Sequence, residues 1–213
     1  MDKDMDASIY DEDYFMRGQE TKKSLYTSYS WKPELTIPMA AVIVRHCGIE
    51  NSDIIVDYGC ARGYVVKALR ELGYTAYGLD VSTWAIDNCD PEVRKYVSRM
   101  WDVVPYKIDW FIAKDVLEHV NMNSLPHCIN ELMDSAKKGI FAVVPLSPTD
   151  GAPYVVADYE LDVTHVHRLT LASWAALFMR PGWSVEARYR LAGVKDNYAA
   201  WERGNGFITA RRI

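Results

Sequence analysis

The chain reads Ile54-Ile55-Val56-Asp57-Tyr58-Gly59-Cys60-Ala61-Arg62-Gly63-Tyr64 at the point that decides its fold. Three apolar β-branched residues in a row predict a strand that is buried on both faces. The small residues at positions 59, 61 and 63 let the backbone approach a ligand closely as the chain turns into a helix. The stretch therefore predicts a strand, a cofactor loop and a helix.

The charge and spacing of this loop favour a cationic ligand. A dinucleotide loop of the form G-x-G-x-x-G would need glycine at Ala61 and Tyr64. Asp57 would repel a pyrophosphate, whereas an ammonium or sulfonium group would be attracted to it. An ordinary turn of another α/β protein remains the alternative for this motif alone.

The same residues resemble the first motif of the class I S-adenosylmethionine-dependent methyltransferases, which runs acid-x-Gly-x-Gly-x-Gly. Residues 57–63 match it except at Ala61, which leaves open how closely that backbone position approaches the ligand. The resemblance implies S-adenosylmethionine as the cofactor. Its implied contacts in this loop are Asp57, Gly59, Cys60, Ala61 and Gly63.

A second motif ends the strand predicted over residues 75–80. Gly78-Leu79-Asp80-Val81-Ser82 resembles the family's second motif, in which a carboxylate binds the ribose and its neighbour lies by the adenosine. Asp80 follows the glycine loop by about 20 residues, and a carboxylate accepts two hydroxyl donors at once. We expect Asp80 and Val81 to contact the cofactor, although Asp80 could instead cap the helix that starts near Ser82.

A looser match follows the third strand, which we expect within residues 93–100. By position, Trp101, Asp102 and Val103 would inherit the family's contacts to the adenine amino group and ring. A surface turn explains these residues nearly as well.

The sequence Asp115-Val116-Leu117-Glu118-His119 follows a buried strand predicted over residues 108–113. It resembles the small-molecule and quinone- or sugar-modifying branches of the family, and differs from the Asn/Asp-Pro-Pro-Tyr loop of enzymes that methylate base nitrogens. We expect Asp115 and Val116 to contact the cofactor and His119 to accept a proton from the substrate. A helix-starting histidine bonded to a carbonyl group is the alternative for His119.

Strands and helices alternate along the chain. Helices are predicted over residues 33–47, from Leu125 to a stop at Gly139, and over 171–179, with strands over 140–145, 184–192 and 206–212. We therefore expect an α/β, Rossmann-like, doubly wound sheet of seven mostly parallel strands, with an antiparallel last strand and helices on both faces. Its ligand should lie at the carboxyl ends of the strands.

A length of 213 residues predicts one domain with decorations. We divide it into an N-terminal arm and helix over residues 1–48, a cofactor-binding core over 49–145, a substrate-side insertion and helix over 146–183, and a C-terminal strand pair over 184–213.

The arm and the insertion hold the candidate acceptor contacts. Tyr14, Tyr29 and Trp31 lie in an aromatic segment that could cover the site or pack on the outside of the core. The insertion supplies Tyr154 and His167 as substrate contacts and His165 as a second candidate base. A divalent ion on Asp158, Asp162, His165 and His167 is conceivable, but an ordinary surface ribbon explains the pattern and we expect no metal.

The composition limits partners and location. A net charge of −5 without a basic run makes a nucleic-acid partner unfavourable, and no apolar run is long enough to cross a bilayer. The first 13 residues are acidic and do not form a signal peptide. Four scattered cysteines are typical of reduced thiols, so we expect a cytoplasmic protein.

These observations predict a methyltransferase that modifies a hydroxyl or amine of a small molecule, such as a sugar or an aromatic metabolite. The alternatives are an accessory protein that binds S-adenosylmethionine on a degenerate methyltransferase fold, and a methyltransferase that acts on a macromolecule. The spacing of the loop opposes a nucleotide-dependent oxidoreductase. The oligomeric state stays open.

Overall fold

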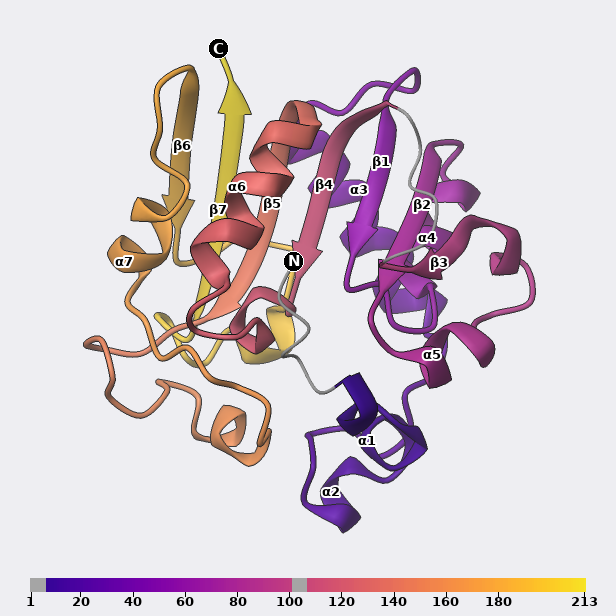
Figure 1. Ribbon diagram of the computed structural model, residues 1–213, viewed down its shortest axis with the longest axis vertical. Helices are drawn as coiled ribbons and strands as arrows, with labels where there is room; N and C mark the ends of the chain where they lie inside the picture. The colour runs from indigo at the N-terminus through magenta and orange to yellow at the C-terminus, as the bar shows by residue number, and fades with distance from the viewer. Residues whose placement is uncertain (1–6, 101–106) are drawn as a thin grey trace.

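A seven-stranded sheet with helices on both faces organises the chain (Figure 1). The computed structural model describes residues 7–100 and 107–213. The strands lie in the order β3-β2-β1-β4-β5-β7-β6, and β7 runs antiparallel to the other six. The predicted Rossmann-like fold is thus confirmed. The strands are β1 (Ile54–Tyr58), β2 (Thr75–Asp80), β3 (Val97–Arg99), β4 (Ile108–Lys114), β5 (Ala136–Pro145), β6 (Trp183–Arg188) and β7 (Asn205–Arg212).

Helices and short 3-10 turns connect the strands. Within the described residues, no helix is both long and apolar enough to cross a membrane. The α-helices are α1 (Glu12–Met16), α2 (Gly18–Thr21), α3 (Pro33–Cys47), α4 (Tyr64–Glu71), α5 (Thr83–Asp87), α6 (Leu125–Ser135) and α7 (Leu171–Ala176). The 3-10 turns are η1 (Ala7–Ile9), η2 (Arg94–Tyr96), η3 (Leu117–His119), η4 (Ala157–Leu161) and η5 (Asp196–Tyr198).

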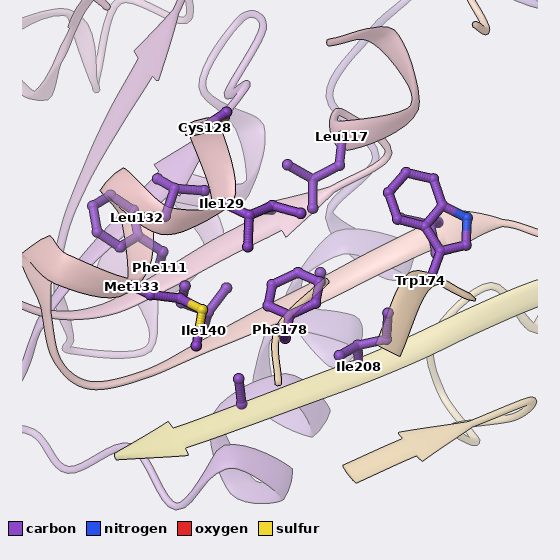
Figure 2. Close-up of a cluster of buried hydrophobic side chains, with 14 of the residues drawn as sticks. Phe111, Leu117, Cys128, Ile129, Leu132, Met133, Ile140, Trp174, Phe178 and Ile208 are labelled. Atoms are coloured by element: carbon purple, nitrogen blue, oxygen red, sulfur yellow. The ribbon is translucent and has the colours of Figure 1, made fainter. Parts of the chain in front are cut away.

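Two apolar clusters fill the space between the sheet and its helices. One lies under α3 and α4, and the other lies under α6 and α7. In the second cluster, Ile129 of α6 and Ile140 of β5 pack with Trp174 and Phe178, as Figure 2 shows. Because both faces of the central strands are covered, the strands read as continuous apolar runs.

Several predicted boundaries are wrong: α7 ends at Ala176 and β6 at Arg188, before residues 179 and 192, and β5 begins before residue 140. The helix expected to run to Gly139 ends at Ser135, and β5 begins at Ala136. Gly139 lies within the strand, where a Cβ atom would come 2.4 Å from Cζ3 of Trp110 on β4. The glycine is therefore required by the packing of β4 against β5 and does not stop the helix.

Parallel pairing brings three carboxylates together at the carboxyl ends of the central strands. Asp57 of β1 is in register with Gly78 of β2 and Ile112 of β4. Asp80 is the last residue of β2, and Asp115 follows β4 directly. The arm formed by α1 and α2 lies beyond the arrowheads of β1 and β4 in Figure 1. The N-terminal arm therefore lies opposite the carboxyl ends of these strands.

Replacing Phe178 by Ala should destabilise the fold by about 3–5 kcal/mol, because it leaves a cavity in a packed core. Phe178 is fully buried, whereas the neighbouring Met179 is 66% exposed. Met179→Ala is the matched control, and its effect should stay within about 0.5 kcal/mol. Urea unfolding of both variants measures the difference, and equal midpoints would contradict the assigned core.

Candidate functional site

A cavity of about 770 Å³ opens at the carboxyl ends of β1, β2 and β4. Its walls come from the loops after these strands, the N-terminal arm, the insertion and the segment before β7. The sequence-predicted cofactor residues that line it are Asp57, Gly59, Cys60, Ala61, Asp80, Val81, Asp115 and Val116. Trp101, Asp102 and Val103 lie outside the described residues.

The loop after β1 packs closely against the segments beside it, and its backbone adopts left-handed conformations. Gly59 has φ +79°, and a Cβ atom there would lie 2.4 Å from Cγ2 of Val116. Ala61 has φ 47°, a left-handed conformation that costs an L-residue about 1–2 kcal/mol. Gly63 precedes α4, packs toward Val93 and does not line the cavity. Alanine at position 61 is therefore accommodated, at the cost of backbone strain.

Asp80 fixes this loop to the tip of β2. Its Oδ2 accepts a hydrogen bond from the Ala61 amide at 2.7 Å, and its Oδ1 accepts one from the Ser82 amide at 2.8 Å. Ser82 caps α5, because its hydroxyl accepts from the Ala85 amide. The capping role considered for Asp80 thus belongs to Ser82, and the Asp80 carboxylate faces the cavity with lone pairs to spare.

Asp57 is a second buried carboxylate of this wall. Burial raises its pKa to about 7, the nearby Asp80 charge adds to the rise, and the Lys114 ammonium opposes it. Burial also raises the pKa of Asp80. Two carboxylates taken out of water on one wall favour a ligand that brings positive charge or hydroxyl donors.

Asp115 differs from the other two carboxylates because lysines neutralise it. The Nζ atoms of Lys114 and Lys195 lie 2.5 and 2.6 Å from its carboxylate oxygens. Although burial acts against them, these two ammonium groups hold the pKa of Asp115 well below its usual range. Sequence reasoning missed both lysines. Lys195 reaches the site from the connection between β6 and β7, where no motif marks it.

The N-terminal arm roofs the cavity with aromatic rings. Tyr14 and Tyr29 line it as expected, while Trp31 packs beside Tyr64 and lies outside it. The Tyr14 hydroxyl donates to Asp162 at 2.8 Å, which joins the arm to the insertion. Tyr10 and Tyr26, which the sequence did not single out as site residues, also line the roof.

Two imidazole rings, those of His119 and His165, line another part of the cavity, with centroids 4.7 Å apart. His119 Nδ1 lies 2.7 Å from the Thr164 hydroxyl, which itself donates to Asp162. His165 Nδ1 lies 2.9 Å from the Tyr159 carbonyl. Both Nδ1 atoms must therefore donate, which leaves the lone pair of each neutral ring on Nε2. Burial lowers the pKa of both rings, that of His119 to about 4.

Glu118 completes this group, and the sequence analysis did not select it. It is 1% exposed and lines the cavity. Within the described part of the chain, its Oε2 has no hydrogen-bond partner. Burial and the nearby Asp115 charge raise its pKa well above the usual range. The Asp-Val-Leu-Glu-His motif could have indicated it, since the glutamate immediately precedes His119.

Two predicted substrate contacts have other partners. Tyr154 donates its hydroxyl to the His167 carbonyl at 2.7 Å, and His167 Nε2 lies 2.7 Å from the Val120 carbonyl. Neither residue lines the cavity. The metal-ligand set considered from the sequence is not brought together either, because Asp158 is exposed and His167 is engaged.

Comparison with known proteins identifies the family. A family described as "Methyltransferase domain" matches residues 38–188, which is more than half of the chain. The chain belongs to this family. The match confirms the resemblance to class I S-adenosylmethionine-dependent methyltransferases. The comparison with curated proteins gives no match.

Solved structures of methyltransferases share the fold. Magnesium protoporphyrin IX methyltransferase from Synechocystis superposes with a TM-score of 0.65 at 14% identity, covering 98% of this chain and 100% of that one. The 1,6-didemethyltoxoflavin-N1-methyltransferase from Burkholderia thailandensis gives 0.64 at 15%, covering 97% and 88%. A methyltransferase from Archaeoglobus fulgidus gives 0.61 at 18%, covering 85% and 95%. At these identities the likeness shows the fold alone.

Asp57→Asn should stabilise this methyltransferase in a pH-dependent way when no ligand is bound. The carboxyl has a pKa near 3.8 when exposed and about 7 when folded. Between these values the unfolded chain releases a proton that the folded chain keeps, so Asp57 lowers stability as pH rises. The variant's advantage should grow from pH 4 to 7, to about 4 kcal/mol at most.

Urea unfolding at half-unit pH steps measures this advantage. Asp134→Asn alters a carboxylate that is 68% exposed and paired with Arg180; it serves as the control and should give no advantage that grows from pH 4 to 7. A difference between Asp57→Asn and the parent that is the same at pH 4 and pH 7 would contradict the assignment.

Proposed function

We propose that this protein transfers the methyl group of S-adenosylmethionine to a hydroxyl group, or an amine, of a small molecule. One observation carries the proposal: a single roofed cavity holds the carboxylates of β1 and β2 on one wall and the His119 and His165 imidazoles on another. When bound, S-adenosylmethionine supplies an electrophilic methyl group on a sulfonium. The chain must supply position and proton removal.

The cofactor side is the wall made by the β1 loop and the β2 tip. Asp80 keeps a lone pair on each oxygen for ribose hydroxyls after accepting from Ala61 and Ser82. Asp57 places negative charge where an ammonium or sulfonium is favoured. Gly59 and Val116 meet closely and leave little room for a side chain beneath the ligand. The sequence predictions for residues 101–103 stay part of this proposal.

The acceptor side is the histidine wall beneath the aromatic roof. Methyl transfer breaks the sulfur–carbon bond, forms an oxygen–carbon bond and releases the hydroxyl proton, which His119 or His165 helps to remove. Both rings present an unprotonated Nε2, as this step requires. Tyr14 and Tyr29 close the cavity from above.

Cavity size and charge favour a small acceptor. A volume of about 770 Å³ lies within the range of small-molecule sites. The net charge of −5 disfavours nucleic acid. Two similar structures are named for small-molecule acceptors, a porphyrin and a toxoflavin precursor. The four buried, free cysteines fit the expectation of a reducing cytoplasm.

Asp80→Ala should reduce the affinity for S-adenosylmethionine at least about a hundredfold, because two ribose hydroxyls lose a charged acceptor. Isothermal calorimetry measures the affinity, with Asp134→Ala as the control. Asp80→Asn keeps an acceptor for the loop, so it tests binding if Asp80→Ala unfolds. Unchanged affinity in a folded Asp80 variant would contradict the cofactor assignment.

His119→Ala and His165→Ala should each lower turnover by about 10²–10⁴-fold while leaving cofactor affinity nearly unchanged. Mass spectrometry with methyl-labelled cofactor and a panel of sugars and aromatic hydroxyl compounds measures transfer. His127→Ala alters an exposed ring and serves as the control. Cofactor binding without transfer to any compound of the panel would support the accessory-protein alternative instead.

A further inference from the structure

Three potential ligand atoms converge at the acceptor wall. One atom each from Glu118, His119 and His165 lies within 4.8 Å of the other two. All three residues line the cavity. Glu118 and His119 belong to η3 after β4, whereas His165 comes from the insertion. The fold therefore brings together two imidazoles and one carboxylate from distant parts of the chain.

Hydrogen bonds prepare both imidazoles as ligands. The Nδ1 atoms are bound to Thr164 and to the Tyr159 carbonyl, so each Nε2 carries its lone pair free of a proton. Asp162 lies behind Thr164 and accepts a hydrogen bond from its hydroxyl group. A carboxylate or carbonyl that holds the far nitrogen of a histidine is the usual support of a metal-binding imidazole.

The carboxyl group of Glu118 is buried beside the two rings, and one of its oxygens, Oε2, lacks a hydrogen-bond partner among the residues that the structure describes. Leaving a buried carboxylate uncompensated is costly. The ammonium groups of Lys114 and Lys195 are already held by Asp115. A cation bound between Glu118 and the two rings would replace the carboxyl proton and pair with the ionised group.

We propose that Glu118, His119 and His165 bind one divalent transition-metal ion on the acceptor side of the cavity. Two imidazoles and one carboxylate suit ions such as Mn²⁺, Fe²⁺, Co²⁺ or Zn²⁺. Ligand atoms about 2.1 Å from one ion lie at most about 4.2 Å apart, so the observed 4.8 Å must close slightly by side-chain rotation. Three ligands leave coordination positions that face the cavity. No metal was expected from the sequence, because an ordinary surface ribbon explained the pattern in the insertion; Glu118 was not among the candidate ligands considered there.

The ion would give the histidines a different task from direct proton transfer. A hydroxyl oxygen bound to it becomes more acidic and releases its proton to water, while the protein holds the oxygen in place for methyl transfer. This consequence rests on the proposed function and narrows its acceptor class to molecules that present an oxygen ligand. The binding site itself does not depend on methyl transfer.

Metal titration of the full chain tests the site directly. The purified protein, without a histidine tag, is stripped with EDTA and titrated with Mn²⁺, Co²⁺ or Zn²⁺ by calorimetry. We expect one equivalent to bind and the melting temperature to rise with metal concentration. With Co²⁺, we expect visible absorption bands and shifted resonances from two imidazole N–H groups. A folded protein that binds none of the three ions would overturn the proposal.

Variants assign the ligands. Glu118→Gln, His119→Ala and His165→Ala should each weaken metal binding at least about tenfold, whereas His127→Ala should not. Glu118→Gln nearly preserves shape, so it remains informative if a histidine variant unfolds. Equal metal affinity in all four variants would refute the site.

A parallel titration with S-adenosylmethionine separates this proposal from the proposed function. Cofactor binding without metal binding would refute the metal site alone and leave the methyltransferase proposal standing. Stoichiometric metal binding that the three ligand variants lose would support the site, even if the cofactor did not bind.

Discussion

The hydrogen bond between the Asp80 carboxylate and the Ala61 amide is the constraint on which the cofactor side of the cavity depends. It ties the loop after β1 to the tip of β2, and the Gly59 and Cys60 amides reinforce it by donating to the Leu79 carbonyl. Ala61 can hold a left-handed conformation only because these bonds offset its strain. The same bonds keep the Asp80 carboxylate directed into the cavity at the carboxyl ends of the strands.

Charge divides the cavity into regions of different chemistry. Asp57 and Asp80 form an anionic wall, whereas Asp115 is balanced by two lysines. Glu118, His119 and His165 line a further part of the cavity, where the two imidazole rings offer lone pairs on Nε2. The carboxylates of β1 and β2 and the two imidazoles thus line different parts of one cavity, which gives it two chemically distinct regions.

The sequence predicted the local parts of this design well and the long-range parts poorly. The helix Pro33–Cys47 and the strand Thr75–Asp80 match their predicted bounds, because apolar periodicity, proline and glycine mark them locally. The glycine loop and Asp80 follow from spacing along two adjacent strands. Tyr14 and Asp162, however, are separated by 148 residues, and no local pattern announces that they meet.

The positions of other site residues could not be predicted from the sequence for related reasons. Lys195 comes from a connection without a motif, and Glu118 was passed over in favour of the histidine beside it. Tyr154 and His167 carry groups typical of substrate contacts, but Tyr154 bonds to the His167 carbonyl and the His167 ring bonds to the Val120 carbonyl. Residue type and position along a loop do not reveal which way a side chain turns, since packing against distant segments decides it.

The bond from Tyr14 to Asp162 has a consequence for the opening of the cavity. The arm and the insertion are also joined by the Val163 amide, which donates to the Lys23 carbonyl at 3.2 Å. The two bonds hold the arm and the insertion together beside the cavity, so breaking them would widen its opening. Such a widening would separate two peripheral segments and need no movement of the central sheet.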